Sequence, residues 1–446
     1  MRKFFQLNFF LFCIGLYGQS DSVILDFQVL RQYDEVHIPE SENLYQELKQ
    51  ITIGDDVTLL WGGSYRIKAE MYHSQMFNNV PQKVESWLNH RGMLHGHLKI
   101  KDKFQLYAEL NTSLVTDKDN LSPIDKDELS FTQLFASFNM NQHWNALLGR
   151  QTIMLGAGRL LDIREGPNVR FSMDMAQLQY HQENTNIITF YGRPVQPSFG
   201  VFDNKIWNNK QQISSIYWTQ DWSEKTHTDL YVIHKDEKQK KFAAGIADDK
   251  RTSLGIRSFG NWNGVNYDNE FIYQLGTFGN QDISAWQLSF FLNKDVHIGR
   301  KWNVGLKANI ISGNKKSNNS LNTFDSHYAR GSYTGSIGYF GLSNLIQFHP
   351  SIGTNFGKLN IDLDYAIFWR YSVDDGIYNP GTRLTFEKDS DEKFIANQIG
   401  LDATYPINNF IDIIFESNMV IPDEYLKTNG YTKDLFYAQL SAQFKF

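Results

Sequence analysis

The sequence predicts an all-β chain whose strands close into a transmembrane antiparallel β-barrel of about 18 strands, of the outer-membrane type. Three observations support this prediction. The chain begins with a secretory signal, its apolar residues alternate with polar ones over long stretches, and it ends in an amphipathic strand whose last residue is phenylalanine. Together they favour a membrane barrel over a soluble β-sandwich.

Residues 1–18 have the three-part pattern of a secretory signal peptide. Basic Arg2 and Lys3 precede an apolar run from Phe4 to Tyr17, and we expect cleavage at the end of this segment. A membrane anchor is the weaker interpretation, because a spanning helix needs about 20 apolar residues. A secreted barrel of this kind belongs in the outer membrane of a Gram-negative bacterium.

Composition limits the kinds of partner. Lys plus Arg number 43 against 49 Asp plus Glu, which gives a net charge of −6. Proteins that bind nucleic acid carry a strongly basic face, so this balance argues against nucleic acid as a partner. Cys13 is the only cysteine and lies in the signal peptide, so we expect no disulfides or thiolate metal sites. The sequence requires no cofactor.

Residues 19–56 are expected to precede the barrel or to lie inside it. Their stretch ENLYQELKQI, residues 42–51, has the composition of a short helix. Residues 57–446 form the transmembrane barrel in this prediction, because no proline-rich linker or change of composition marks a second domain.

Period-two alternation predicts the strands. In KLNIDLDYAIFWRY, residues 358–371, apolar side chains from Leu359 to Trp369 share one face, whereas Asn360 and Asp362 begin the other. The strand-like segments are 57–73, 91–100, 103–114, 130–140, 143–153, 176–182, 185–193, 211–220, 226–234, 252–260, 264–276, 283–293, 301–312, 332–340, 344–354, 358–371, 393–405, 409–418 and 434–446. The expected polar loops are 117–128, 236–250, 313–332 and 374–392.

A soluble sandwich and a membrane barrel could both use such strands, but strand length favours the barrel. The segments run to about 10 residues or more, the length that crosses a bilayer at a tilt, whereas soluble strands average about 5 to 6. The final stretch FYAQLSAQFKF places Phe436, Leu440 and Phe446 on one face. A terminal aromatic on a last amphipathic strand resembles the assembly signal of bacterial outer-membrane barrels. We therefore expect a monomer surrounded by outer-membrane lipid.

The stretch GRQTIMLGAGRLLDIREGPNVRFSMD, residues 149–174, gathers four arginines among glycines. It lacks the strand-to-helix context of a phosphate-binding loop. A charged side chain that faces lipid at mid-depth costs about 2–4 kcal/mol, so arginines on spanning strands should point into the lumen. There a guanidinium can hold a carboxylate by two hydrogen bonds and keeps its charge.

The chain resembles the alginate-export family of outer-membrane barrels. The resemblance rests on LKQITIGDDVTLLWGGSYRIKAEMY (48–72), on the 149–174 stretch with its Gly-x-x-Arg-Leu, and on ISGNKKSNNSLNTFDSHYARG followed by GLSNLIQFHP. It spans essentially the whole chain after the signal peptide. It implies a channel of about 18 strands for a polyanion, with a constriction lined by arginines and acidic partners.

This resemblance assigns the pore-lining role to a set of charged residues. The arginines would supply fixed cations, and the two acids would hold them in place and moderate their pull on the cargo. The set is Arg66, Arg150, Arg159, Asp162, Arg164, Glu165, Arg170, Arg193 and Arg370. The alternative is that arginines and acids pair across the lumen only to stiffen the wall.

The function implied is passive diffusion of a polar, anionic, alginate-like polysaccharide or oligosaccharide, with periplasmic secretion or uptake proteins as partners. The alternative is a general or neutral-oligosaccharide porin with a mixed-charge lumen, because many acids stand on polar strand faces. These acids are Glu70, Glu109, Asp268, Glu270, Asp362, Asp364, Asp402, Asp412 and Glu416.

An outer-membrane enzyme is the minor alternative. Such hydrolases bring Ser, His and a polar partner together, but dipeptides such as Ser326–His327 stand isolated in the sequence. His95 and His97 share a strand face, yet no third metal ligand is evident. The sequence thus predicts no catalytic residues and no metal site.

Overall fold

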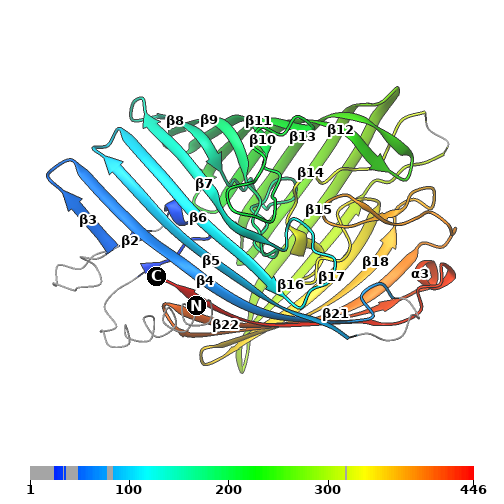
Figure 1. Cartoon of the computed structure of the whole chain (residues 1–446). Helices are drawn as coiled ribbons and strands as arrows, with labels where there is room; N and C mark the ends of the chain where they lie inside the picture. Colours follow the sequence, from blue (N-terminus) through cyan, green and yellow to red (C-terminus); the bar gives the residue numbers. More distant parts are fainter. Residues whose placement is uncertain (1–24, 34, 37–48, 78–83, 317–318) are drawn as a thin grey trace.

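The strands of the computed structural model close into one antiparallel barrel (Figure 1). The structure describes residues 25–33, 35–36, 49–77, 84–316 and 319–446. The 18 wall strands are β4 (Val57–His73), β5 (Val84–Ile100), β6 (Phe104–Thr116), β7 (Asp127–Asn139), β8 (Trp144–Gln151), β9 (Met173–Gln182), β10 (Thr185–Pro194), β11 (Gln211–Ser223), β12 (Thr226–Phe242), β13 (Gly245–Trp262), β14 (Val265–Phe278), β15 (Gln281–Ile298), β16 (Arg300–Ile311), β17 (Leu345–Phe356), β18 (Leu359–Arg370), β21 (Phe394–Asn408), β22 (Ile411–Pro422) and β23 (Leu435–Lys445).

Pairing of the last strand with the first long strand closes the ring. β23 runs antiparallel to β4, from the pair Phe436↔His73 to the pair Lys445↔Ser64. Because every wall strand then has two neighbours, no sheet edge is left open in the bilayer, where unpaired backbone groups would find no water.

Alternation along each strand separates a lipid face from a lumen face. On β15, Phe290 and Leu292 are exposed outside the barrel, whereas the neighbouring Ser289 is fully buried inside it. Leu363 and Tyr365 of β18 are exposed in the same way. The exposed apolar side chains form the band that contacts lipid in barrels of this type.

The two ends of the barrel differ. At the end where β23 finishes, short turns such as 224–225 and 263–264 join the strands. At the other end, three long connections turn inward: loop 152–172, loop 312–344 and loop 371–393 (Figure 1). Membrane barrels of bacteria keep short turns on the periplasmic side and long loops on the outside.

The hydrophobic core lies inside the barrel, between the wall and the inserted loops. Leu161, Phe324 and Tyr378, one from each loop, are fully buried. They belong to one apolar cluster with wall residues such as Ile233 and Phe368. The three loops are therefore packed parts of the barrel interior.

One expected strand is wrong. Residues 332–340 alternate in sequence, but their start belongs to the 3-10 helix η2 (Gly331–Thr334). Gly335 and Gly338 follow with positive φ values of 148° and 58°, which L side chains rarely adopt. The chain therefore bends inside the lumen instead of extending along the wall.

The expected loop at 236–250 is also wrong, because these residues form the hairpin of β12 and β13. Their charges face loop 312–344, where the ammonium of Lys240 lies 3.8 Å from Asp325. The signal peptide, and most of the helix expected at 42–51, lie outside the described residues. β3 (Gln50–Ile53) pairs with the start of β4. Among the described residues, no helix is long and apolar enough to cross a membrane.

A segment near the N-terminus lies inside the barrel, against one side of the wall. We call residues 27–33 the N-terminal strap. Its contacts are Phe27 with Phe410 (6.2 Å between rings), Arg31 with the carbonyls of Gly63 and Phe446 (3.1 Å each), and Gln32 with Gln133 (3.1 Å). These partners lie in the turn before β22, at the β23–β4 seam and on β7, so the strap follows one side of the wall across neighbouring strands.

Candidate transport channel

Loop 152–172 is fixed to β4 and β5 by an arginine cluster, which consists of Arg66, Arg91, Arg170 and Glu165. Arg66 and Arg91 are cross-strand neighbours. Both donate to the main-chain carbonyl of Glu165, at 3.0 and 3.2 Å. Arg91 and Arg170 also bond the Glu165 carboxylate, which lies 3.8 Å from Arg66.

One carboxylate thus serves three guanidinium groups. Burial alone would raise the pKa of Glu165, but the positive charges of Arg170, Arg91 and Arg66 outweigh it and hold the pKa far below its usual range. Glu165 is therefore ionised throughout the physiological pH range. The cluster braces the loop against the wall, and with three guanidinium groups to one carboxylate it keeps an excess of positive charge.

Replacing Glu165 with Gln should loosen loop 152–172, because three buried guanidinium groups lose their anion. Breaking a fully buried ion pair from one side costs about 3–5 kcal/mol, and the loss here should be smaller, because the Glu165 side chain is 36% exposed and solvent screens part of the interaction. The pKa of Glu165 is lower in the folded protein than in the unfolded chain, where it is about 4.3. The carboxylate therefore stabilises the fold above that pH, and this stabilisation is lost as the pH falls from there toward the folded pKa. Urea unfolding in detergent at neutral and acidic pH measures both effects.

The control for this prediction is Glu128→Gln, which removes a pair at 2.9 Å with Lys126, a cation that is 27% exposed where Arg91 is 1% exposed. Exposed pairs contribute about 0–1 kcal/mol. Equal destabilisation by the two substitutions, or an unchanged acid transition in Glu165→Gln, would show that Glu165 does not hold the loop.

Arg159 joins loop 152–172 to the opposite wall. Its guanidinium donates to Asp268 at 2.9 Å and Glu270 at 2.8 Å, both on β14. It also donates to the hydroxyl of Tyr333 in loop 312–344, at 2.6 Å. Only 2% of the Arg159 side chain is exposed, so this arginine is a buried link between two loops and the wall.

Arg164 and Asp162 connect all three inserted loops. Arg164 donates to the carbonyl of Ala329 at 3.2 Å and to that of Pro380 at 2.9 Å. Asp162 accepts hydrogen bonds from Arg330 at 3.3 and 3.4 Å. These contacts fix the relative positions of the loops in the lumen.

Three of the sequence-predicted arginines lie away from the open channel. Arg150 shares the outward strand face with Leu148 and pairs with Asp174 at 2.8 Å. Arg193 shares its outward face with exposed Tyr191 and lies over Trp207, with 4.7 Å to the ring centroid.

Arg370, the third, is fully buried and donates to main-chain carbonyls of loop 371–393, including those of Val373 and Asp375 at 3.2 Å. Its role in the structure is to hold that loop. We therefore leave Arg150, Arg193 and Arg370 out of the proposed lining.

Two cations that sequence reasoning did not select face the channel. Lys307 of β16 shares the lumen face with buried Asn309, while Val304 and Ile310 are exposed outside. No hydrogen bond or ion pair of its ammonium occurs among the described residues, and the ammonium lies 5.7 Å from the ring centroid of Tyr333. Arg330 exposes 44% of its side chain. Lys307 stands at a polar position of the alternating segment 301–312, and this position was the signal in the sequence that could have identified it.

A strip of acids lines the lumen face of β18, β21 and β22. Asp362 pairs across strands with Asp402, and Asp402 with Glu416. These three carboxylates form no ion pair within the described part of the chain. Asp364, beside them, bonds the His349 ring at 2.7 Å. Lys307 lies within electrostatic reach of Asp364 and Asp402, so the channel surface is mixed in charge.

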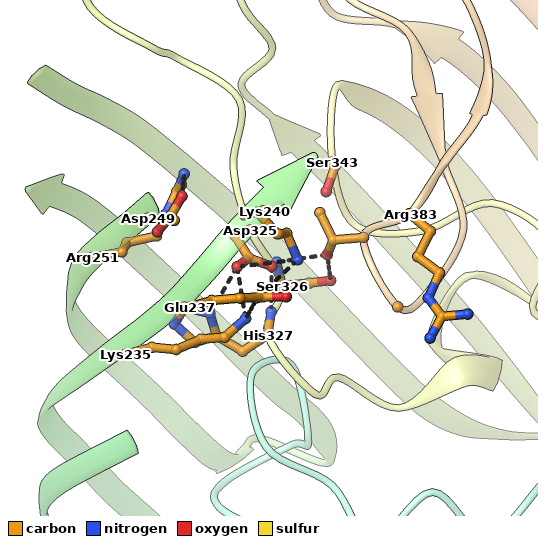
Figure 2. A network of polar contacts seen from close by, with 12 residues as sticks. Lys235, Glu237, Lys240, Asp249, Arg251, Asp325, Ser326, His327, Ser343 and Arg383 are labelled. Atoms are coloured by element: carbon orange, nitrogen blue, oxygen red, sulfur yellow. Dashed lines mark hydrogen bonds and ion pairs between the residues drawn. The ribbon is translucent and has the colours of Figure 1, made fainter. Parts of the chain in front are cut away.

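One arrangement in the lumen resembles a hydrolase triad, and Figure 2 shows two of its members, Asp325 and His327. The Ser253 hydroxyl lies 3.1 Å from Nε2 of His327, whose Nδ1 lies 3.4 Å from Asp325. All three are buried, and the Ser253 hydroxyl also accepts from Gln274 at 3.0 Å, so it is held as part of the loop packing. In the described ranges, no group of three or more His, Cys, Asp or Glu residues could hold a metal ion.

The closed barrel with its charged lumen defines an outer-membrane channel of the porin type. A family model described as alginate export matches residues 57–433, and the chain belongs to this family. No curated protein matches the sequence.

Solved structures share the fold. OccK2 (OpdF) of Pseudomonas aeruginosa, in complex with glucuronate, is 10% identical with a TM-score of 0.60, covering 86% of this chain and 98% of that one. OccAB1 of Acinetobacter baumannii is 10% identical with a TM-score of 0.59, covering 86% and 96%. OpdQ of Pseudomonas aeruginosa is 10% identical with a TM-score of 0.57, covering 86% and 97%. At this identity the likeness establishes the fold alone.

Proposed function

We propose that the protein is a passive outer-membrane channel for a polar, anionic saccharide of the alginate type. The observation that carries the proposal is the pair of lumen cations, Lys307 and Arg330. The ammonium of Lys307 forms no ion pair or hydrogen bond among the described residues, and Arg330 exposes 44% of its side chain although it pairs with Asp162 at 3.3 Å. A fixed cation on a narrow, partly desolvated channel lowers the entry cost of a carboxylate.

Family membership and one fold neighbour support the same substrate class. The family is described by alginate export, and the OccK2 structure holds glucuronate. Arg159, Arg164 and the arginine cluster act indirectly in this proposal, because they hold the loops that position Arg330 and narrow the lumen. We propose a monomer in outer-membrane lipid that works with periplasmic secretion or uptake proteins and performs no catalytic step. Its signal peptide would be removed.

Ion selectivity in planar bilayers tests the proposal. Replacing Lys307 and Arg330 with Gln should lower the chloride-to-potassium permeability ratio about two- to fivefold, because fixed charges set the local ion concentration. The same variant should show fewer current blocks by a uronic-acid oligomer. Lys316→Gln is the control, since that side chain is 78% exposed in loop 312–344. Cation preference in the unaltered protein would overturn the anionic substrate class.

The acid strip of β18, β21 and β22 favours a second candidate, a general or neutral-oligosaccharide porin. Asp362, Asp402 and Glu416 offset the lumen cations on one side of the channel. Equal blocking by neutral and uronic oligosaccharides, with weak ion selectivity, would favour this candidate over the anionic one.

A further inference from the structure

A recess lies in the wall nearer the short turns. It has a volume of about 330 Å³ and is lined by the turn before β12, the start of β12, the end of β13, the start of β14 and Phe291 of β15. We call it the wall pocket. Its side chains face the lumen, because Arg257 and Phe259 share a strand face with buried Ser253, whereas Ile256 is exposed outside. Its volume is at the small end of the range for ligand sites, roughly 300–1,000 Å³.

A fixed guanidinium forms the inner edge of the wall pocket. Arg257 donates to both oxygens of Asp268, at 2.9 and 2.7 Å, and to Asp229 at 2.8 Å. These bonds use three of the five N–H groups that a guanidinium offers, so the group is held in place with donors left for a ligand. At the outer edge, the amide of Asn261 donates to Asn266 at 2.7 Å, which orients a second polar side chain.

Aromatic rings supply the apolar side of the wall pocket. Phe259 stacks on His227 with 4.9 Å between ring centroids, and the guanidinium of Arg257 lies 3.8 Å from the Phe259 centroid. Phe291 makes no ring contact with any described residue, so its ring is not covered by another aromatic. Flat aromatic faces beside oriented polar groups suit a ligand that has an apolar face and a polar edge.

The charges around the wall pocket indicate which part of a saccharide it binds. Asp229, Asp268 and Glu270 outnumber Arg257 and Arg159, which pair with them. A carboxylate of the cargo would meet this excess of negative charge. Sugar hydroxyls can instead donate to the aspartates and accept from the remaining guanidinium and amide N–H groups.

Backbone geometry fixes the edge of the wall pocket. Gly260 has a φ of 149°, and a Cβ built there would lie 2.0 Å from the carbonyl oxygen of Lys225. Only glycine allows the turn before β12 to approach β13 this closely. The recess is therefore set by the hairpin itself.

We propose that the wall pocket is a saccharide subsite that holds one pyranose ring by its hydroxyl groups and its apolar face. It would act on the short-turn side of the inserted loops, after or before the saccharide passes Lys307. This inference rests on the proposed function, because it presumes a saccharide in the lumen. The test separates the subsite from the proposed anionic substrate class, because a site that binds hydroxyl groups should hold neutral and charged sugars alike.

The experiment measures how long oligosaccharides block the ion current of single channels in planar bilayers. The probes are a uronic-acid trimer and the neutral sugar maltotriose. Loss of one aromatic stacking contact should shorten the block time about three- to tenfold, so Phe291→Ala should shorten it for both probes and leave ion selectivity unchanged. Phe290→Ala, on the lipid face of the same strand, is the matched control.

Asn266→Ala is a second variant, which removes a polar side chain at the pocket edge in case Phe291→Ala fails to assemble. Unchanged block times in whichever of the two variants assembles would overturn the subsite and leave the channel proposal intact. An unaltered channel that neither sugar blocks would overturn both. Shortened blocks for the uronic trimer alone would assign the effect to charge, which also contradicts a hydroxyl-binding subsite.

Discussion

Asp325→Asn is expected to release loop 312–344 from the barrel wall. Asp325 is buried in that loop, and its carboxylate lies 3.0 Å from the ammonium of Lys235 and 3.8 Å from that of Lys240, both on β12 (Figure 2). The same carboxylate accepts a hydrogen bond from the backbone N–H of His327 at 2.9 Å. One side chain of the loop therefore neutralises two cations of the wall.

The size of the effect follows from burial. Burial alone would raise the pKa of Asp325, but the charges of Lys235 and Lys240 hold it well below its usual range, so the group is ionised. Asparagine keeps the shape and removes the charge, which leaves two lysines with only Glu237, 2.7 and 3.2 Å away. Removing one partner of a buried pair costs about 3–5 kcal/mol.

Two measurements check this expectation. Limited proteolysis of the folded channel should cut the variant within loop 312–344 at sites that are protected in the unaltered protein, and its single-channel current should become noisier. Asp295→Asn is the control, because Asp295 near the end of β15 pairs with Lys301 at the start of β16 and both side chains are exposed. Protection and current noise equal to those of the unaltered protein would mean that the loop is held by its apolar core alone.

Strand positions were predictable because each strand repeats one simple rule over a long stretch. In the segment 358–371, alternation alone placed Leu363 outside and Asp364 inside, and the structure agrees. The rule failed at 332–340, where Gly335 and Gly338 bend an alternating stretch inside the lumen. Alternation of apolar and polar residues indicates a segment with two unlike faces. A loop that packs inside the barrel can show the same alternation as a strand of the wall.

The path of the inserted loops was not predictable, and this path decides the site. Glu165 meets Arg91, 74 residues earlier in the chain, only because loop 152–172 turns back into the lumen. Arg150 faces outward at the end of β8, where the chain leaves the wall and Asp174 neutralises it. The rule that sends arginines inward concerns an unpaired charge that faces lipid, so it did not anticipate an arginine whose charge is paired on the outward face.

Removing the N-terminal strap is expected to raise the conductance of the channel. Residues 27–33 lie inside the barrel against one side of the wall, from the turn before β22 to β7, so they occupy part of the cross-section. Conduction depends on the narrowest and most crowded section of a pore. If the strap forms such a section, deletion of residues 25–33 should increase the single-channel conductance at least about twofold.

A cross-link distinguishes a strap that moves from one that is fixed. Cys13 is the only cysteine of the chain, so Gln32→Cys with Gln133→Cys introduces a defined pair at a contact of 3.1 Å in the native protein. A short bifunctional thiol reagent should then hold the strap in its lumen position and abolish any voltage-dependent rise in conductance. The two single-cysteine variants are the controls. A deletion variant with the conductance of the full chain would contradict this prediction. Ions would then pass freely beside the strap, and the narrowest section of the pore would lie elsewhere.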